Sequence, residues 1–315
     1  MNIIPKNLLA ILLLSCFSCY SCASGSRLSG SLASQTDSTS HTMLIEKGAK
    51  LQLVSKQFSF TEGPAADKKG NIFFTDQPND KIWKYSTDGK LSVFLDNSGR
   101  SNGLYFDKKG NLIACADEHN QLWSISPEKE VTVLLKDFGG KLLNGPNDLW
   151  VDTNGGIYFT DPYYHRDYWN RDKQEIEKQN LYYLPKGENQ AIIVDDNFVQ
   201  PNGIIGTPDG TSLFVADIGA GKTYRYTINA VGQLTNKQLF VEQGSDGMTL
   251  DQEGNLYLTG KGVTVYNKGG EKVLHIDVPE PWTGNLTFGG KDRNILFITA
   301  SKAIYTLKMQ VKGAK

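Results

Sequence analysis

The chain has 315 residues, of which 39% are hydrophobic and 21% are charged, and its formal net charge is −1. This near-neutral balance argues against a nucleic-acid partner, because binding to a phosphate backbone requires a clustered basic face. The 32 glycines and only 4 methionines favour many tight turns over long helices.

The N-terminus is typical of an export signal. Lys6 precedes an apolar run over Leu8–Cys16, which is shorter than the roughly 20 apolar residues of a membrane-spanning helix. Residues 1–15 are therefore interpreted as a signal peptide. The tetrapeptide LLSC is similar to a bacterial lipobox, which predicts cleavage before Cys16 and lipidation of this residue. A plain secretory signal cleaved near Cys22 is the alternative.

Residues 16–42 are rich in serine and poor in apolar side chains, as expected of a disordered tether. We expect an exported protein that is periplasmic, or membrane-anchored only through the lipid on Cys16. Three of the four cysteines lie in this leader, so Cys115 is the one cysteine of the folded part and an internal disulfide is excluded. Cys115 is expected to be an inert, buried strand residue.

A motif of about forty residues recurs six times over the predicted folded domain, residues 43–310. Its copies begin at Thr61 (TEGPAADKKGNIFFTD), Ser101 (SNGLYFDKKGNLIACAD), Pro146, Pro201, Ser245 and Gly284. Each copy predicts an alternating strand, a tight turn and a second apolar strand, usually followed by two further strands.

Six four-stranded units without a long helix predict an all-β protein, a six-bladed β-propeller. We expect an N-terminal strand within residues 41–54 to join the last blade and close the ring. A two-sheet sandwich is the competing architecture, and six copies of one motif argue against it.

One polar position recurs in all copies. In the first five it lies eight residues before the glycine of the turn, as from Glu62 to Gly70. Because strands have a fixed rise and a period of two, equal spacing predicts one structural position, at the start of the innermost strand. Six oxygen-bearing side chains are therefore expected around the mouth of the central channel: Glu62, Asn102, Asn147, Asn202, Asp246 and Asn285.

The chemistry of this set predicts a bound cation. Asn-Gly and Asp-Gly pairs also occur in ordinary turns, but turn chemistry does not explain Glu62, or two carboxylates in a channel otherwise lined by amides. Carboxylates packed together are costly without compensation. All-oxygen ligands suit one divalent ion, Ca²⁺ first, with Mg²⁺, Mn²⁺, Fe²⁺ or Zn²⁺ as alternatives. No histidine or cysteine enters the set, which argues against a standard zinc site.

The pentapeptide GRSNG at residues 99–103 matches the Gly-x-Ser-x-Gly pattern of a serine-hydrolase nucleophile elbow. That pattern carries chemistry where a strand turns sharply into a helix. Here it opens the innermost strand of an all-β repeat, so Ser101 is expected to be part of the scaffold rather than a nucleophile.

The third copy is longer than its neighbours, with 55 residues from Gly155 to Gly210 against 40 from Gly70 to Gly110. The excess, residues 162–179, follows a strand expected to end on the face of the site. It predicts a lid or substrate wall, and for its charged second half a solvated surface loop is the alternative. Tyr163 and His165 are the proposed substrate contacts, among the available Tyr163, Tyr164, His165, Arg166, Tyr168 and Trp169.

The ordered set TEGP, NGPNDLWVD, PNGI, SDGM and TFGGKDRNILFITA resembles the gluconolactonase family, which includes senescence marker protein (regucalcin) and diisopropylfluorophosphatase. The resemblance covers residues 58–307. It implies a six-bladed propeller with a catalytic divalent cation at the top of its channel. By motif, it implies metal contacts from Glu62, Asn147, Asn202 and Asp246.

The resemblance leaves Asn102 and Asn285 as substrate-binding groups that line the pocket. Asp148 and Asp161 are expected outside the ligand set, as groups that support it. Some members of the family place an arginine just before the Asn-Asp pair to hold the sugar. Gly145 and Pro146 stand there in this chain. The resemblance therefore does not identify which lactone is the substrate.

The expected reaction is the hydrolysis of a sugar lactone, glucono-1,5-lactone or a related aldonolactone, to the sugar acid. The metal would polarise the ester carbonyl, and Asp246 would position or deprotonate the attacking water, with direct attack by its carboxylate as a variant. The alternatives are another ester or organophosphate hydrolase on the same metal, or a non-catalytic, surface-tethered binding module. The expected partner is a small molecule, and the expected state is a monomer.

Overall fold

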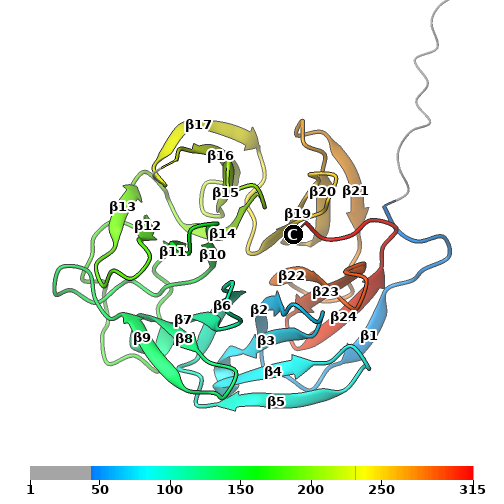
Figure 1. Cartoon of the computed structure of the whole chain (residues 1–315), viewed down its shortest axis with the longest axis horizontal. Helices are drawn as coiled ribbons and strands as arrows, with labels where there is room; N and C mark the ends of the chain where they lie inside the picture. Colours follow the sequence, from blue (N-terminus) through cyan, green and yellow to red (C-terminus); the bar gives the residue numbers. More distant parts are fainter. Residues whose placement is uncertain (1–43, 231, 315) are drawn as a thin grey trace, which may run out of the picture. The chain divides into compact units, whose positions relative to one another are not determined.

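The computed structural model describes residues 44–230 and 232–314. The predicted signal peptide, the serine-rich tether and Cys16 lie outside the described residues. Within those residues, 24 strands form six separate four-stranded antiparallel sheets. These are the six blades of a β-propeller, which confirms the predicted fold (Figure 1).

The blades share one strand order, from the axis to the rim. The innermost strands are β2 (Thr61–Ala66), β6 (Ser101–Phe106), β10 (Leu149–Val151), β14 (Pro201–Gly206), β18 (Met248–Leu250) and β22 (Asn285–Gly289). The second strands are β3 (Ile72–Asp76), β7 (Leu112–Ala116), β11 (Ile157–Asp161), β15 (Ser212–Asp217), β19 (Leu256–Gly260) and β23 (Ile295–Ala300).

The third strands are β4 (Lys81–Tyr85), β8 (Gln121–Ile125), β12 (Asn180–Leu184), β16 (Lys222–Ile228), β20 (Gly262–Tyr266) and β24 (Ala303–Lys308). The outermost strands are β5 (Leu91–Asp96), β9 (Val131–Leu135), β13 (Ile192–Asp195), β17 (Leu234–Val241), β21 (Lys272–Ile276) and β1 (Gln52–Ser55). Two 3₁₀ turns follow the second strands of the first two blades, at Gln77–Asn79 and Asp117–His119.

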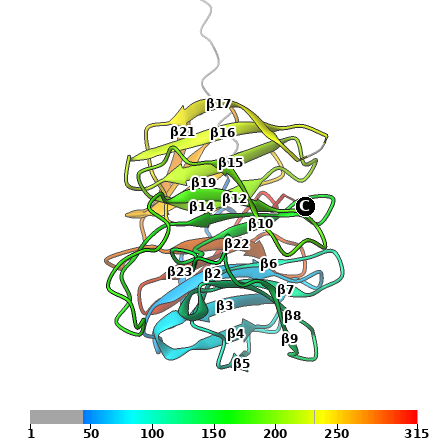
Figure 2. The same ribbon diagram turned by 90° about the vertical axis from the view of Figure 1, so that its left-hand side faces the viewer.

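The innermost strands form a closed ring. Each of them contacts the innermost strands of both neighbouring blades, from β2 through β6, β10, β14, β18 and β22 back to β2. The blades are arranged around this ring in Figure 1, and Figure 2 shows them from the side. All innermost strands therefore begin at the same face of the propeller.

The ring is closed by the N-terminal strand, as predicted. Strand β1 pairs antiparallel with β24, with Gln52 opposite Thr306 and Leu53 opposite Tyr305. The last blade thus combines one strand from the start of the described chain with three from its end. This arrangement ties the two ends of the propeller together, so that the ring cannot open between the first and last blades without breaking the sheet of the last blade.

The repeated turn between the first two strands explains the spacing of the sequence motif. In the first blade, Oδ1 of Asp67 accepts hydrogen bonds from the backbone N–H groups of Lys69 and Asn71, at 2.8 and 2.9 Å. Gly70 completes the turn with a φ of +88°, in the left-handed region that glycine adopts without strain. These turns lie at the face of the propeller opposite to the starts of the innermost strands.

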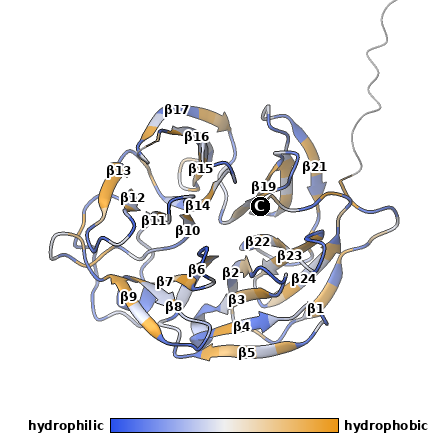
Figure 3. Cartoon of the chain, in the orientation of Figure 1, coloured by the Kyte–Doolittle hydropathy of each residue, from blue (hydrophilic) through white to orange (hydrophobic). Residues whose placement is uncertain are grey.

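The core lies between the blades, and the hydrophobic residues follow the strands while the loops are hydrophilic (Figure 3). Cys115 is fully buried in the cluster between the second and third blades, as expected, and forms no disulfide. Ser101 is also buried, and its hydroxyl donates to the carbonyl of Ser98 at 2.6 Å. Strand β6 leads into β7 without a helix, so the elbow geometry is absent at GRSNG. No helix of the described residues is long and apolar enough to cross a membrane.

Candidate active site

The six polar residues of the repeated position lie where the innermost strands begin. Glu62, Asn102, Asn202 and Asn285 fall within the first two residues of their strands, and Asn147 and Asp246 stand two residues before theirs. Five of them are buried, and Asp246 is partly exposed. Because all innermost strands start at one face, this end of the channel is surrounded by carboxylate and amide oxygens.

The innermost strands approach each other very closely at this point. In four blades the ring residue is followed by glycine, at Gly63, Gly103, Gly203 and Gly247. A Cβ atom on Gly247 would lie 2.0 Å from Cγ of Asn285, and one on Gly203 would lie 2.7 Å from the carbonyl oxygen of Asp246. Of these four glycines only Gly63 has a positive φ. At the other three, the Asn-Gly or Asp-Gly pair reflects close packing between blades rather than turn chemistry.

Acidic side chains gather at one side of this ring. Burial raises the pKa of Glu62 well above its usual value, and the charges of Asp246 and Asp148 add to that effect. Burial also raises the pKa of Asp246, although hydrogen bonds from Trp282 and Asn202 oppose it. Burial raises the pKa of Asp148 to about 7. Three acids that repel one another in a buried site are the environment that a bound cation would stabilise.

An unsatisfied oxygen lies in the same group. The amide nitrogen of Asn202 donates to the hydroxyl of Tyr164 at 3.0 Å, so the amide presents its oxygen as a separate acceptor. Among the described residues this buried Oδ1 has no hydrogen-bond partner. A buried polar atom without a partner is costly, and a cation ligated by this oxygen would satisfy it.

Over residues 44–230 and 232–314, no three His, Cys, Asp or Glu side chains are arranged to hold a metal together. The predicted set of two carboxylates and two amides therefore depends on its amide oxygens. Hard divalent ions bind such oxygens. The buried acids and the free oxygen of Asn202 fit an oxygen-ligated divalent ion.

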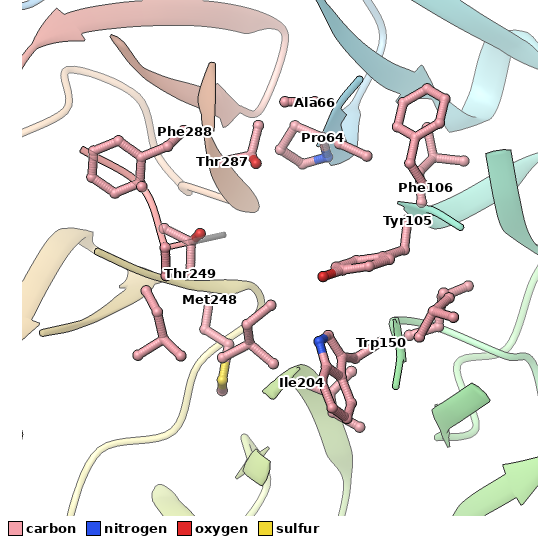
Figure 4. A pocket seen from close by; sticks show the side chains of 18 of the residues that line it. Pro64, Ala66, Tyr105, Phe106, Trp150, Ile204, Met248, Thr249, Thr287 and Phe288 are labelled. Atoms are coloured by element: carbon pink, nitrogen blue, oxygen red, sulfur yellow. The ribbon is translucent and has the colours of Figure 1, made fainter. Parts of the chain in front are cut away.

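A cavity of about 420 Å³ runs along the innermost strands below the ring. Asp148 and Asn285 line one end of it, and Lys68 and Thr153 of the opposite turns line the other. Its walls combine apolar and charged side chains, and Figure 4 shows Tyr105 and Trp150 facing into it from neighbouring blades.

Three ring residues connect the blades through their backbones, and one of them is Asn202, whose carbonyl accepts from the hydroxyl of Thr160 at 2.7 Å. The carbonyl of Asn102 accepts from the hydroxyl of Thr75 at 3.1 Å, and the carbonyl of Asn147 accepts from the backbone N–H of Gly103 at 2.7 Å. Asn285 instead uses its side chain, which donates to Oδ2 of Asp148 at 3.4 Å. Asp148 thus lies beside the ring, at the place predicted for a supporting group. The metal contact predicted for Asn147 and the substrate contacts predicted for Asn102 and Asn285 stay predictions.

Trp282 is a site residue that the sequence analysis missed. Its indole Nε1 donates to Oδ2 of Asp246 at 2.6 Å. The backbone of Trp282 is held in turn by the hydroxyl of Ser301, which bonds to both its N–H and its carbonyl. A sequence signal existed, because this tryptophan stands three residues before Asn285 in PEPWTGN. That position does not show that the indole bonds to Asp246, which precedes the innermost strand of another blade.

The aspartates that end second strands hold loops rather than the ring. Asp161 accepts from the backbone N–H groups of Asn144 and Gly145, at 2.9 and 2.8 Å. Asp76 and Asp217 accept in the same way from the segments that lead into their own innermost strands. Asp161 therefore supports the segment that carries Asn147, from outside the ring.

Asp117, between β7 and β8, differs from these three aspartates because it anchors the insertion of the third blade. Its carboxylate accepts from Nε of Arg166 at 3.0 Å and from the hydroxyl of Tyr168. Its carbonyl accepts from the indole of Trp169 at 3.0 Å. Residues 162–179 are therefore fixed across the second blade, beside the ring.

The insertion contributes Tyr164 and Arg166 to the site. Tyr164 bonds to Asn202, and the guanidinium of Arg166 lies 5.4 Å from the centre of the Tyr164 ring. Arg166 also lowers the pKa of Asp246 through its charge. The two proposed substrate contacts lie elsewhere: Tyr163 packs against Trp169, and His165 is exposed, 4.0 Å from Asp167. Substrate contact by Tyr163 and His165 stays a prediction.

Comparison with known proteins decides the family. Residues 60–302 match the family model described as the SMP-30/Gluconolactonase/LRE-like region. The chain belongs to this family. The resemblance inferred from the motifs is thus confirmed over more than two thirds of the chain.

Several named proteins are similar to this chain over more than half of its length. A gluconolactonase of Zymomonas mobilis is 25% identical over 302 residues, which cover 86% of this chain and 84% of the relative. A solved structure of a gluconolactonase from Xanthomonas campestris aligns with a TM-score of 0.78 and 26% identity, covering 85% of this chain and 91% of that one. The diisopropyl-fluorophosphatase of Loligo vulgaris is 29% identical over 196 residues, covering 57% of this chain and 62% of the relative.

Proposed function

We propose that this protein is a metal-dependent lactonase that opens a sugar lactone, glucono-1,5-lactone or a related aldonolactone, to the sugar acid. Membership of the gluconolactonase family supports the reaction class. One observation on this chain carries the proposal: buried Glu62 and partly exposed Asp246, both with raised pKa values, lie with the partnerless amide oxygen of Asn202 at one end of the channel.

Glu62, Asn147, Asn202 and Asp246 would hold the cation. When bound, a divalent ion, Ca²⁺ as the first candidate, supplies Lewis-acid polarisation of the ester carbonyl. Glu62 and Asp246 supply the negative charge for it, and the two asparagines supply neutral oxygens. The close packing at Gly203 and Gly247 holds the innermost strands so that these side chains are preorganised.

Asp246 is the proposed general base. Trp282 binds one of its carboxylate oxygens, Oδ2, and thereby fixes the direction of the other. Arg166 favours its ionised form, as does the hydrogen bond from Trp282. A carboxylate held in this way can orient a water molecule and take its proton as it attacks the lactone carbonyl. Tyr164, which bonds to Asn202, and Arg166, which lies over the Tyr164 ring, would form one wall of the space for the lactone.

The test follows acid release from glucono-1,5-lactone at constant pH, above the uncatalysed rate. We expect the activity to stop with a chelator and to return with Ca²⁺, Mg²⁺, Mn²⁺, Fe²⁺ or Zn²⁺, in an order that identifies the preferred ion. Glu62→Gln and Asp246→Asn should weaken Ca²⁺ binding in calorimetry and abolish the activity. Full activity in both folded variants would overturn the proposed site.

Hydrolysis of an organophosphate is the second candidate, because one relative is a diisopropyl-fluorophosphatase. The same cation would polarise a phosphoryl oxygen. Parallel assays with diisopropyl fluorophosphate and glucono-1,5-lactone separate the two. If neither a lactone nor an organophosphate is hydrolysed with any divalent ion, the result favours the third candidate, a binding module.

We further propose that the protein is exported and anchored through a lipid on Cys16. The apolar run over Leu8–Cys16 and the LLSC tetrapeptide support this proposal. A labelled fatty acid should be incorporated by the full chain and not by Cys16→Ser. Incorporation into both forms, or into neither, contradicts the anchor. Sedimentation of the propeller should give the mass of a monomer.

A further inference from the structure

A second cavity adjoins the candidate catalytic group. It has a volume of about 450 Å³ and lies along the fifth blade. Thr259, Gly260 and Trp282 form part of its wall near the ring, and Lys272, which pairs with Tyr266, borders it toward the opposite end of the blade. Trp282 is also the residue whose indole binds Asp246. The cavity and the ring therefore share this side chain as a common boundary.

The charged lining of this cavity is entirely basic. Lys261, Lys272 and His275 line it, and no aspartate or glutamate does. Lys261 and Lys272 take part in none of the ion pairs formed among the described residues. His275 has a partner outside the lining, Asp277, which is fully exposed and lies 3.5 Å from its Nε2. Two lysines thus border the cavity without a protein carboxylate to neutralise them.

The neutral polar groups add donors rather than acceptors. Oε1 of Gln243 accepts from the hydroxyl of Tyr266 at 2.8 Å, so the amide nitrogen of Gln243 is the group left for a ligand. Thr264 and Nδ1 of His275 bond to each other at 3.1 Å, and Nε2 of the histidine lies 3.5 Å from Oδ1 of Asp277, so the histidine is not counted as a group left for a ligand. A cavity rich in donors and cations recognises an anion.

We propose that this cavity is the subsite for an acidic substituent at the end of the lactone remote from its ester. The inference rests on the proposed lactonase function and deepens it by naming the substrate class, an anionic aldonolactone. With the ester at the ring, the apolar face of the sugar lies against the indole of Trp282. The acidic group beyond it reaches Lys261 and Lys272. These lysines bind only that group, and the ester carbonyl is bound by the ring residues.

The test compares 6-phosphoglucono-1,5-lactone with glucono-1,5-lactone, each corrected for uncatalysed opening. The parent protein should have the higher kcat/KM on the phosphorylated lactone. The double variant Lys261→Met, Lys272→Met should lose about tenfold or more of kcat/KM on that lactone, and should retain its activity on the neutral one. Lys302→Met is the matched control, because Lys302 lies in the equivalent hairpin turn of the sixth blade and lines neither cavity.

If the double variant loses kcat/KM equally on both lactones, or on neither of them, the proposed subsite is wrong. Binding of the stable product 6-phosphogluconate, measured by calorimetry, separates this outcome from failure of the proposed function. If neither lactone is opened but 6-phosphogluconate binds and requires both lysines, the subsite stands and the lactonase proposal fails. If the neutral lactone is opened and 6-phosphogluconate binds the parent and the double variant equally, the subsite is wrong and the lactonase stands.

Discussion

The indole nitrogen of Trp282 donates a 2.6 Å hydrogen bond to Oδ2 of Asp246. Asp246 introduces the fifth blade, whereas Trp282 stands in the segment that enters the sixth. The orientation of the proposed base is therefore set from the neighbouring blade. The proposed mechanism therefore requires the fifth and sixth blades to pack correctly against each other, in addition to Asp246 itself.

Trp282→Phe tests that dependence. A hydrogen bond to a charged group contributes about 1.5–3 kcal/mol, so kcat should fall roughly tenfold to a hundredfold. The pKa of Asp246 should rise, because the bond from Trp282 lowers it, and the acidic limb of the pH–rate profile should move to higher pH. Trp83→Phe is the control, since the indole nitrogen of Trp83 has no partner among the described residues. An unchanged profile for Trp282→Phe contradicts the proposed positioning.

The buried acids predict how stability depends on pH in chelator. Asp148 has an ordinary pKa of 3.8 and a folded value of about 7, so the folded chain binds the proton more tightly than the unfolded chain. The stabilising contribution is complete below about pH 4 and is lost as pH rises through about 7. The pKa of Glu62 shifts in the same direction.

Denaturant unfolding in chelator should therefore give a free energy of unfolding that decreases between pH 5 and pH 8, and added Ca²⁺ should restore it most at pH 8. Asp148→Asn should flatten this dependence, because its amide does not titrate. If the variant and the parent keep the same slope, Asp148 is not the group that titrates.

Gly247→Ala tests the close approach of the blades. The new Cβ atom would collide with the side chain of Asn285, and overpacking of this kind costs about 1–3 kcal/mol. We expect a lower melting temperature together with weaker Ca²⁺ binding, since the collision occurs at the ring. Gly269→Ala is the comparison, because there the nearest atom belongs to the side chain of Asn267 in an exposed turn. Equal melting temperatures for the two variants would refute the packing argument.

Asp117→Asn tests the anchor of the insertion. It removes the ionic partner of Arg166 and weakens the bond to Tyr168, so residues 162–179 should detach more often. Trypsin should then cleave this segment faster, and KM for the lactone should rise. Asp167→Asn provides a matched control within the same loop, where the aspartate is fully exposed. If both variants are cleaved at the parental rate, Asp117 does not hold the loop.

The repeat made the architecture readable from the sequence. Six copies of one motif, five of them with the same spacing, predicted the blades, their innermost strands and the closing strand β1, because strand periodicity and turn chemistry are local properties. The same spacing placed Glu62 and Asp246 at equivalent positions in different blades. It also excluded Ser101 as an elbow nucleophile, since no helix follows it.

The contacts around those positions were not readable in this way. Asp161 ends the second strand of its blade and Asp117 directly follows the second strand of its own, yet Asp117 anchors the insertion of another blade and Asp161 binds its own entry loop. In the sequence, the glycine of an Asn-Gly or Asp-Gly pair indicates a turn. In the structure, Gly203 and Gly247 are needed because a neighbouring strand leaves no room for a Cβ atom.

The sequence by itself thus determined the propeller, the ring of oxygen-bearing residues and the family, since each depends on patterns within one repeat or on their order. Only the tertiary structure decided that Trp282 orients Asp246, that Tyr164 reaches Asn202, and that Lys261 and Lys272 border a cavity beside them. These relationships join segments far apart along the chain, and their geometry is set by how the blades pack around the axis.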